Sequence, residues 1–142
     1  MDMPLNLNDF EQAARERLPL MIYDYFAGGA GDEITVRDNE LAWRGWRLRP
    51  RVLVDVSQRD LSTTVLGQPV SLPILIAPCG LSGMAHPDGE CAVTRAAAAA
   101  GTIHIVSTVA TRSLEEVAEA CEGPRWFQLY CYRDREITRA LI

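Results

Sequence analysis

Residues 72–80 read LPILIAPCG, a short apolar run that ends at a proline, a cysteine and a glycine. The four consecutive apolar residues from Ile74 to Ala77 are typical of a strand that is covered on both faces, as in a parallel sheet. Two further strand-like runs lie at 103–107 and 125–129, with helical patterns at 87–100, 114–121 and 134–142. Strand and helix therefore alternate, which predicts right-handed crossovers and a parallel α/β sheet.

The residues before this stretch are expected to form short helices and then a hairpin. Asn8, with Glu11 three residues later, is expected to cap the first helix. Helices are predicted over 8–18, 20–27 and 32–43, and an antiparallel hairpin with its turn at Gly67 over 63–72. The chain thus divides into a helical segment at 1–46, an extended segment with a hairpin at 47–72, and three strand–helix units at 73–142.

Three strand–helix units are too few for a closed barrel. A closed eight-stranded (β/α)8 barrel takes roughly 250 residues, whereas this chain has 142. We therefore interpret the chain as the N-terminal part of a larger protein. A complete three-stranded domain is the alternative.

Composition and charge exclude several classes of protein. With 48% hydrophobic and 23% charged residues the chain is an ordinary globular sequence, and its net charge of −5 comes without the basic clusters of a nucleic-acid binder. No apolar stretch is long enough to span a bilayer, and the N-terminus lacks a secretory signal. The four cysteines are widely spaced and form no C-x-x-C pair, which argues against a zinc site or a disulfide framework. We expect a soluble cytoplasmic protein without a metal site.

Ligands of parallel α/β folds meet the carboxyl ends of the strands. This rule selects three groups of residues: Ala77-Pro78-Cys79-Gly80, Ser107-Thr108-Val109 and Gln128-Leu129-Tyr130. They offer backbone amides beside a glycine, a hydroxyl, an amide side chain and a phenol. Such groups suit a flat heterocycle with a polar edge, and they do not form a nucleophile–base pair.

The same residues belong to a set of motifs that resembles a known family. Five motifs occur in order: Tyr23-Asp24-Tyr25-Phe26-Ala27-Gly28-Gly29-Ala30, Arg49-Pro50-Arg51, Leu72-Pro73-Ile74 with Ala77-Pro78, Ala85-His86-Pro87-Asp88-Gly89-Glu90, and Trp126-Phe127-Gln128-Leu129-Tyr130. Together they resemble the FMN-dependent α-hydroxy-acid oxidases and dehydrogenases, such as glycolate oxidase, lactate oxidase and mandelate dehydrogenase. The resemblance implies a TIM barrel with FMN in its mouth, and oxidation of an L-2-hydroxy acid to a 2-oxo acid.

The resemblance also implies roles for individual residues. It assigns substrate contacts to Tyr25 and Tyr130, and flavin contacts to Pro78, Cys79, Gly80, Ser107 and Gln128. The family's general-base histidine, substrate arginines, flavin-edge lysine and phosphate site fall beyond Ile142, so no catalytic residue is assigned within this segment. The full-length protein is expected to be a homo-oligomer.

One position departs from part of the family. Val109 stands where glycolate-type members carry tryptophan, which favours a bulkier substrate than glycolate.

Several polar residues are expected to be structural rather than catalytic. His86 precedes a helix and His104 is out of phase with Ser107, so neither is assigned as a base. Asp88 and Glu90 lie near a predicted helix start, as do Glu115 and Glu116, where carboxylates complement the helix dipole on a solvated face.

Two other functions stay open. One is another FMN-barrel enzyme, such as an isomerase of a phosphorylated substrate, for which a basic cluster at the barrel mouth would be expected. The other is a truncated, inactive chain.

Overall fold

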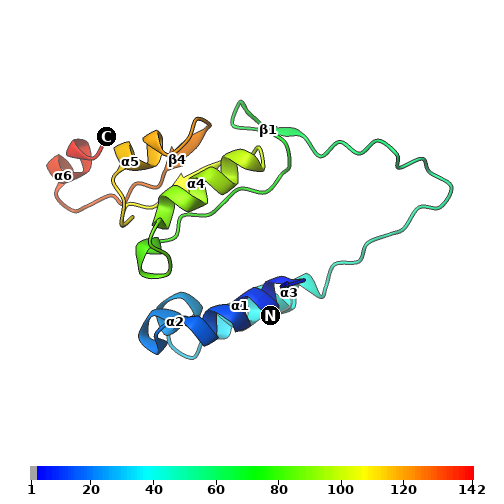
Figure 1. Cartoon of the computed structure of the whole chain (residues 1–142), viewed down its shortest axis with the longest axis horizontal. Coiled ribbons are helices and arrows are strands. Elements are labelled where there is room, and N and C mark those ends of the chain that lie inside the picture. The colour runs from blue at the N-terminus through cyan, green and yellow to red at the C-terminus, as the bar shows by residue number, and fades with distance from the viewer. Residues whose placement is uncertain (1–2) are drawn as a thin grey trace. The chain divides into compact units, whose positions relative to one another are not determined.

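The computed structural model describes residues 3–142 and divides the chain into two compact units. The N-terminal unit ends at Val56, and the C-terminal unit begins at Ser57. No helix or strand lies between Trp43 and Thr63, so the boundary falls within the extended segment that the sequence predicts (Figure 1).

The N-terminal unit consists of three short helices, α1 (Leu7–Arg17), α2 (Leu20–Ala27) and α3 (Ile34–Trp43). The cap of α1 is Asn6, whose side chain accepts a hydrogen bond from the Asp9 N–H at 3.0 Å. The prediction that Asn8 caps this helix is wrong, because Asn8 already lies in its first turn. Asn6 has the extended backbone that a capping residue requires, with φ of −148°.

The C-terminal unit opens with a hairpin at the predicted position. Strands β1 (Thr63–Val65) and β2 (Gln68–Val70) pair antiparallel. Both residues of the connecting turn have positive φ, 48° at Leu66 and 82° at Gly67. This is the turn geometry that matches the twist of the two strands, and glycine adopts it readily.

An alternating series of helices and strands follows the hairpin. Its elements are the 3-10 turn η1 (Ser82–Met84), α4 (Gly89–Ala99), β3 (His104–Val106), α5 (Leu114–Glu119), β4 (Arg125–Phe127) and α6 (Arg135–Ala140). Strands β3 and β4 are parallel, with His104 opposite Arg125. The result is a partial α/β unit, and the described residues form no closed barrel.

The first predicted strand, Ile74 to Ala77, is reduced to a single parallel bridge between Ile76 and His104. The Ile76 N–H donates to Ile103 O, and the Ile105 N–H donates to Ile76 O, both at 3.0 Å. Pro73 and Pro78 carry no N–H, which limits the pairing of this segment.

The expectation that this segment is buried on both faces is wrong. Ile74 is 62% exposed and Ile76 is 37% exposed. Among the described residues, only β3 pairs with the segment, so its other edge and its faces lack the neighbours that would bury them.

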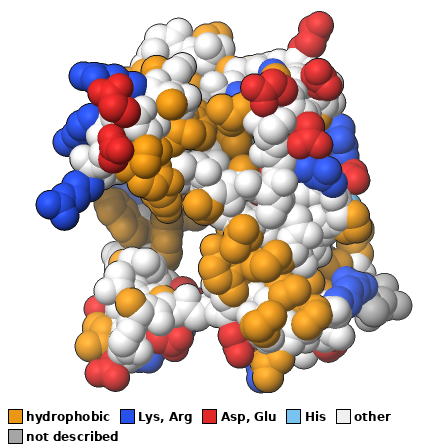
Figure 2. Space-filling model, turned by 90° about the vertical axis from the view of Figure 1, so that its left-hand side faces the viewer, with side chains coloured by type: hydrophobic (Ala, Val, Ile, Leu, Met, Phe, Trp, Pro, Cys, Tyr) orange, Lys and Arg blue, Asp and Glu red, His pale blue; other side chains and the backbone are white. Residues whose placement is uncertain are grey.

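The hydrophobic core of the C-terminal unit lies between its helices and β3. Ile103, Val106 and Val117 are fully or almost fully buried, and the small Ala97 allows α4 to pack closely. Helix α4 contacts both β3 and α5. Many large apolar side chains nevertheless remain exposed, and they form the orange areas between charged groups in Figure 2. None of the helices within residues 3–142 combines the length and apolarity needed to cross a membrane.

Candidate functional site

The three groups of residues predicted from the strand-end rule are connected by hydrogen bonds. The Leu81 N–H, next to Gly80, donates to Val109 O at 3.1 Å. The Gln128 N–H donates to Val106 O at 2.8 Å, which continues the pairing of β3 and β4 beyond their ends. The structure therefore brings the predicted residues of the C-terminal unit together at the carboxyl ends of the strands.

Thr108 joins two of these groups through its side chain. Its hydroxyl donates to the backbone carbonyl of Gln128 and accepts from the Tyr130 N–H, the second bond at 3.0 Å. The strand-end rule placed Thr108 in one of the three groups but assigned it no role. The signal in the sequence that could have indicated this role was the hydroxyl side chain of Thr108 at a strand end.

Two side chains at this edge keep unused hydrogen-bonding capacity. Ser107 is 2% exposed, and its Oγ accepts from the Val109 N–H at 3.2 Å. Within residues 3–142 the Ser107 O–H donates to no protein group, and the half-buried Gln128 amide neither donates nor accepts. The Ser107 hydroxyl can donate a hydrogen bond, and the Gln128 amide can both donate and accept. These groups fit the edge of a flavin pyrimidine, which presents carbonyl oxygens and an N–H.

The loop at Pro78, Cys79 and Gly80 supplies backbone rather than a nucleophile. Desolvation of the thiol raises the pKa of Cys79, and the negative charge of Glu90 raises it further. The thiolate is the reactive form of cysteine, so a raised pKa makes Cys79 a poor nucleophile at neutral pH.

The two predicted phenols are both partly exposed. Tyr130 is 46% exposed at the end of the segment after β4. Tyr25 lies on α2 in the N-terminal unit and is 50% exposed, with its ring packed edge-on against Phe26 at 5.0 Å.

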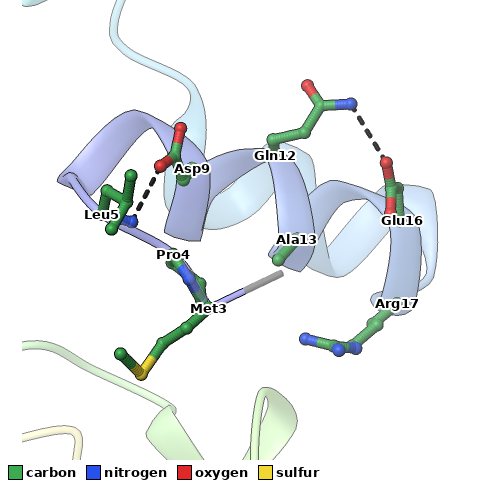
Figure 3. A pocket seen from close by; sticks show the side chains of 8 residues that line it. All are labelled: Met3, Pro4, Leu5, Asp9, Gln12, Ala13, Glu16 and Arg17. Carbon is green, nitrogen blue, oxygen red and sulfur yellow. Dashed lines mark hydrogen bonds between the residues drawn. The ribbon is translucent and has the colours of Figure 1, made fainter. Parts of the chain in front are cut away.

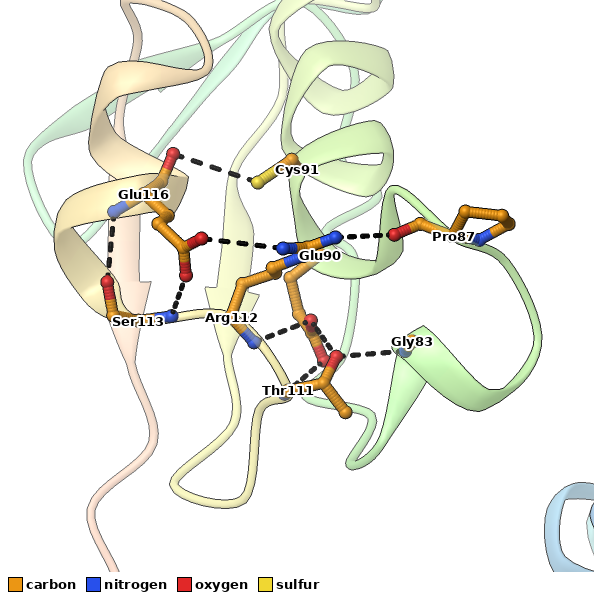
Figure 4. Close-up of polar contacts among 8 residues, drawn as sticks. All are labelled: Gly83, Pro87, Glu90, Cys91, Thr111, Arg112, Ser113 and Glu116. Atoms are coloured by element: carbon orange, nitrogen blue, oxygen red, sulfur yellow. Dashed lines mark hydrogen bonds and ion pairs between the residues drawn. The ribbon is translucent and has the colours of Figure 1, made fainter.

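A buried carboxylate lies beside the strand-end loops and was not predicted from the sequence. Glu90, near the start of α4, is only 1% exposed, so the prediction of a solvated face is wrong for this residue. Its oxygens accept hydrogen bonds from the backbone N–H groups of Thr111 and Arg112 and from the Thr111 hydroxyl (Figure 4). They also accept from the Ser82 N–H. Burial acts to raise the pKa of Glu90, but these hydrogen bonds outweigh it and hold the pKa below its ordinary value.

The other carboxylates of this region have local structural roles. Glu116 and Ser113 form a capping box at the start of α5, as expected for carboxylates near a helix start. Asp88 is exposed and forms an ion pair with Arg95.

Neither histidine lies among the strand-end groups. The Nδ1 of His86 accepts from the Asp88 N–H at 3.1 Å before α4. His104 begins β3, at the opposite end of that strand from Ser107, and is 3% exposed with its Nδ1 buried and unpartnered. Burial lowers the pKa of His104, and Arg125 lowers it further against an opposing effect of Glu90.

A surface hollow along α1 holds none of the predicted site residues (Figure 3). It is lined by Met3, Pro4, Leu5, Asp9, Gln12, Ala13, Glu16 and Arg17. Across the part of the chain that the structure describes, no group of three or more histidine, cysteine, aspartate or glutamate side chains could hold a metal ion.

Comparison with known protein families matches residues 14–142 to the family described as "FMN-dependent dehydrogenase". The chain belongs to this family. The match covers both units and includes every residue predicted for the site.

Individual members of the FMN-dependent dehydrogenase family are similar over almost the whole chain. An L-lactate oxidase from Nostoc sp. is 51% identical over 98% of this chain, and glycolate oxidase 3 from Oryza sativa is 49% identical over all of it. The chain spans only 39% of the length of each of these curated relatives.

Solved structures of the family have the same fold over this segment. A soluble mutant of the membrane-associated (S)-mandelate dehydrogenase from Pseudomonas putida superposes with a TM-score of 0.91 at 44% identity, covering 98% of this chain and 40% of that one. A lactate oxidase from Pediococcus acidilactici gives a TM-score of 0.91 at 34% identity, covering 99% of this chain and 39% of that one. The partial α/β unit therefore corresponds to part of the fold of these enzymes.

Proposed function

We propose that this chain supplies the first strand–helix units of a TIM barrel that binds FMN and oxidises an L-2-hydroxy acid to a 2-oxo acid. The observation that carries this proposal is that the Ser107 hydroxyl and the Gln128 amide, both with unused hydrogen-bonding capacity, lie at the carboxyl ends of neighbouring strands. The family supports FMN as the cofactor, and the named relatives support a 2-hydroxy acid as the substrate class. In the experiments below, the intact enzyme means a full-length member of the family that contains these 142 residues.

The residues proposed to hold the flavin ring come from all three groups. Backbone at Pro78, Cys79 and Gly80 would contact the ring, and the side chains of Ser107 and Gln128 would form hydrogen bonds with its pyrimidine edge. Bound FMN supplies the two-electron redox chemistry, while the protein supplies orientation and electrostatics. The unused O–H of Ser107 and the free amide of Gln128 are the protein side of these contacts.

The substrate is proposed to meet phenols rather than a base from this chain. Tyr25 and Tyr130 orient the carboxylate or hydroxyl of the 2-hydroxy acid, since a phenol can both donate and accept a hydrogen bond. Oxidation removes a hydride equivalent from the α-carbon and a proton from the hydroxyl. The buried position of His104 at the start of β3 argues against it as the group that takes this proton.

The proposal is tested by reduction of the intact enzyme under anaerobic conditions. L-lactate and L-mandelate should bleach the flavin absorbance, with 2-oxo acid formed in equal amount to flavin reduced. A protein that carries FMN but is reduced by none of several 2-hydroxy acids would contradict the proposed reaction. The homo-oligomer and the cytoplasmic location expected from the sequence stay predictions, to be checked by sedimentation and by cell fractionation.

A further inference from the structure

We propose that Glu90 is a positioning residue, whose carboxylate fixes the loop after the first strand segment against the loop after β3. This inference rests on the proposed function, because those two loops carry four of the five residues proposed to contact FMN, Pro78, Cys79, Gly80 and Ser107. Ser82 follows Gly80 by two residues, and Thr111 follows Val109 by two residues. Glu90, on the third element α4, accepts hydrogen bonds from Ser82 and from Thr111, and Figure 4 shows those from Thr111.

Both carboxylate oxygens of Glu90 are needed to accept the hydrogen bonds from the donors around it. Oε1 accepts from the Ser82 N–H at 3.2 Å and the Thr111 N–H at 3.0 Å. Oε2 accepts from the Thr111 hydroxyl at 2.7 Å and the Arg112 N–H at 3.2 Å. A glutamine has one acceptor oxygen, so in either orientation its NH2 group would face at least one backbone N–H.

The contact between the loops leaves no space for larger residues. The Gly83 N–H donates to the Thr111 hydroxyl at 2.9 Å, and a Cβ on Gly83 would lie 2.5 Å from that same oxygen. Gly89 has a φ of 47°, and a Cβ there would lie 3.1 Å from the Thr111 hydroxyl. Both glycines therefore permit the close approach that the carboxylate holds in place.

One more hydrogen bond connects the Glu90 cluster (Glu90, Ser82, Thr111 and Arg112) to the proposed flavin site. The Leu81 N–H donates to Val109 O at 3.1 Å, and among the described residues neither Leu81 nor Val109 forms a hydrogen bond with Glu90. If Glu90 positions the loops, removal of its charge should weaken the hydrogen bond between Leu81 and Val109 as well as the hydrogen bonds that Glu90 itself accepts. A role limited to holding α4 would leave the bond intact.

The test compares Glu90→Gln and Glu90→Asp with Asp88→Asn in the intact enzyme, by hydrogen exchange of backbone amides and by titration with FMN. Asp88 is the matched control, because it is an exposed carboxylate two residues away that bonds Arg95 and neither loop. In Glu90→Gln the amide oxygen should keep the two backbone donors at Oε1, so exchange should accelerate about tenfold or more at Arg112 and less at Ser82. Exchange at Leu81 should accelerate too, while Gln128 in the sheet should be unchanged.

The two assays separate failure of this inference from failure of the proposed function. Faster exchange at Leu81 together with FMN binding weakened several-fold, in Glu90→Gln but not in Asp88→Asn, supports the inference. Unchanged exchange at Leu81, or unchanged FMN affinity in Glu90→Gln alongside weaker FMN binding in Gln128→Leu, overturns it and leaves the proposed function standing. A wild-type protein that binds no FMN overturns the proposed function, and Leu81 exchange then decides whether Glu90 positions the loops.

A second pair of variants serves if Glu90 variants do not fold. Thr111→Val removes the hydroxyl that Glu90 and Gly83 share, and Thr111→Ser keeps it. Loss of Leu81 protection in Thr111→Val and its rescue in Thr111→Ser supports the inference. Equal protection in the two variants overturns it.

Discussion

The hydroxyl of Thr108 donates a hydrogen bond to the backbone carbonyl of Gln128, across the carboxyl ends of β3 and β4. The same oxygen accepts from the Tyr130 N–H, so one side chain holds the segment that carries two proposed site residues. Thr108→Val keeps the shape of the side chain and removes both bonds. We expect it to lower the free energy of unfolding of the intact enzyme by about 1–3 kcal/mol, because two hydrogen bonds are lost and each contributes about 0.5–1.5 kcal/mol.

The matched control at this position is Thr108→Ser, which keeps the hydroxyl. Urea unfolding should give Thr108→Ser a stability near that of the wild type, and FMN titration should show weaker binding for Thr108→Val alone. Equal stability of the valine and serine variants would show that the hydroxyl does not hold this segment.

The small side chain at position 109 predicts the size of the substrate. Val109 is 40% exposed beside Ser107 and leaves space that a larger residue would fill. Val109→Trp should lower kcat/KM for mandelate about 10- to 200-fold, while the value for glycolate falls much less. Steady-state kinetics with glycolate, lactate and mandelate would measure this, with Val109→Ala as the control. A wild-type preference for glycolate would contradict the prediction.

Burial of His104 predicts a pH dependence of stability. The pKa of His104 is lowered from its ordinary value of 6.5, so below pH 6.5 the unfolded chain binds a proton that the folded chain resists. Stability should therefore fall as the pH decreases from 6.5 through the lower folded-state pKa. Thermal unfolding of the intact enzyme from pH 8 to pH 5 should show a steeper decline for the wild type than for His104→Leu. Identical declines would mean that His104 is protonated equally in both states.

The open edge of β4 predicts the behaviour of the 142-residue chain expressed alone. Within the described residues β4 pairs only with β3, and an unpaired edge beside exposed apolar side chains promotes aggregation. We expect the isolated chain to aggregate, to bind FMN weakly or not at all, and to show no turnover with a dye acceptor. Size-exclusion chromatography and flavin absorbance measure this. A soluble yellow monomer with turnover would contradict the interpretation that further strands complete the site.

The features that the sequence predicted best are those set by neighbouring residues. The hairpin follows from the Leu66-Gly67 turn, and α2 from its position between Pro19 and Gly28. The strand-end groups followed from a general rule of parallel sheets, and hydrogen bonds connect them in the structure.

The features that the sequence missed depend on contacts between distant residues. Glu90 has the pattern of a solvated carboxylate near a helix start, and only its bonds to Ser82 and Thr111 reveal a buried cluster. The apolar run at Ile74 to Ala77 predicts a covered strand, but cover comes from neighbours that are far away in sequence. The cap of α1 was also missed, because residue spacing indicated Asn8 whereas the extended backbone that a cap requires lies at Asn6.

The central claim is that residues at the carboxyl ends of these strands contact FMN, and the FMN dissociation constant of Gln128→Leu tests it most directly. The variant removes an amide that has no other partner among the described residues. Fluorescence titration of the apo form of the intact enzyme should show affinity reduced by about 1–3 kcal/mol relative to wild type, with a shifted flavin absorbance band. Gln12→Leu, which changes an exposed glutamine bonded to Glu16 on α1, should leave both unchanged. An unaltered dissociation constant and spectrum in Gln128→Leu would contradict the claim.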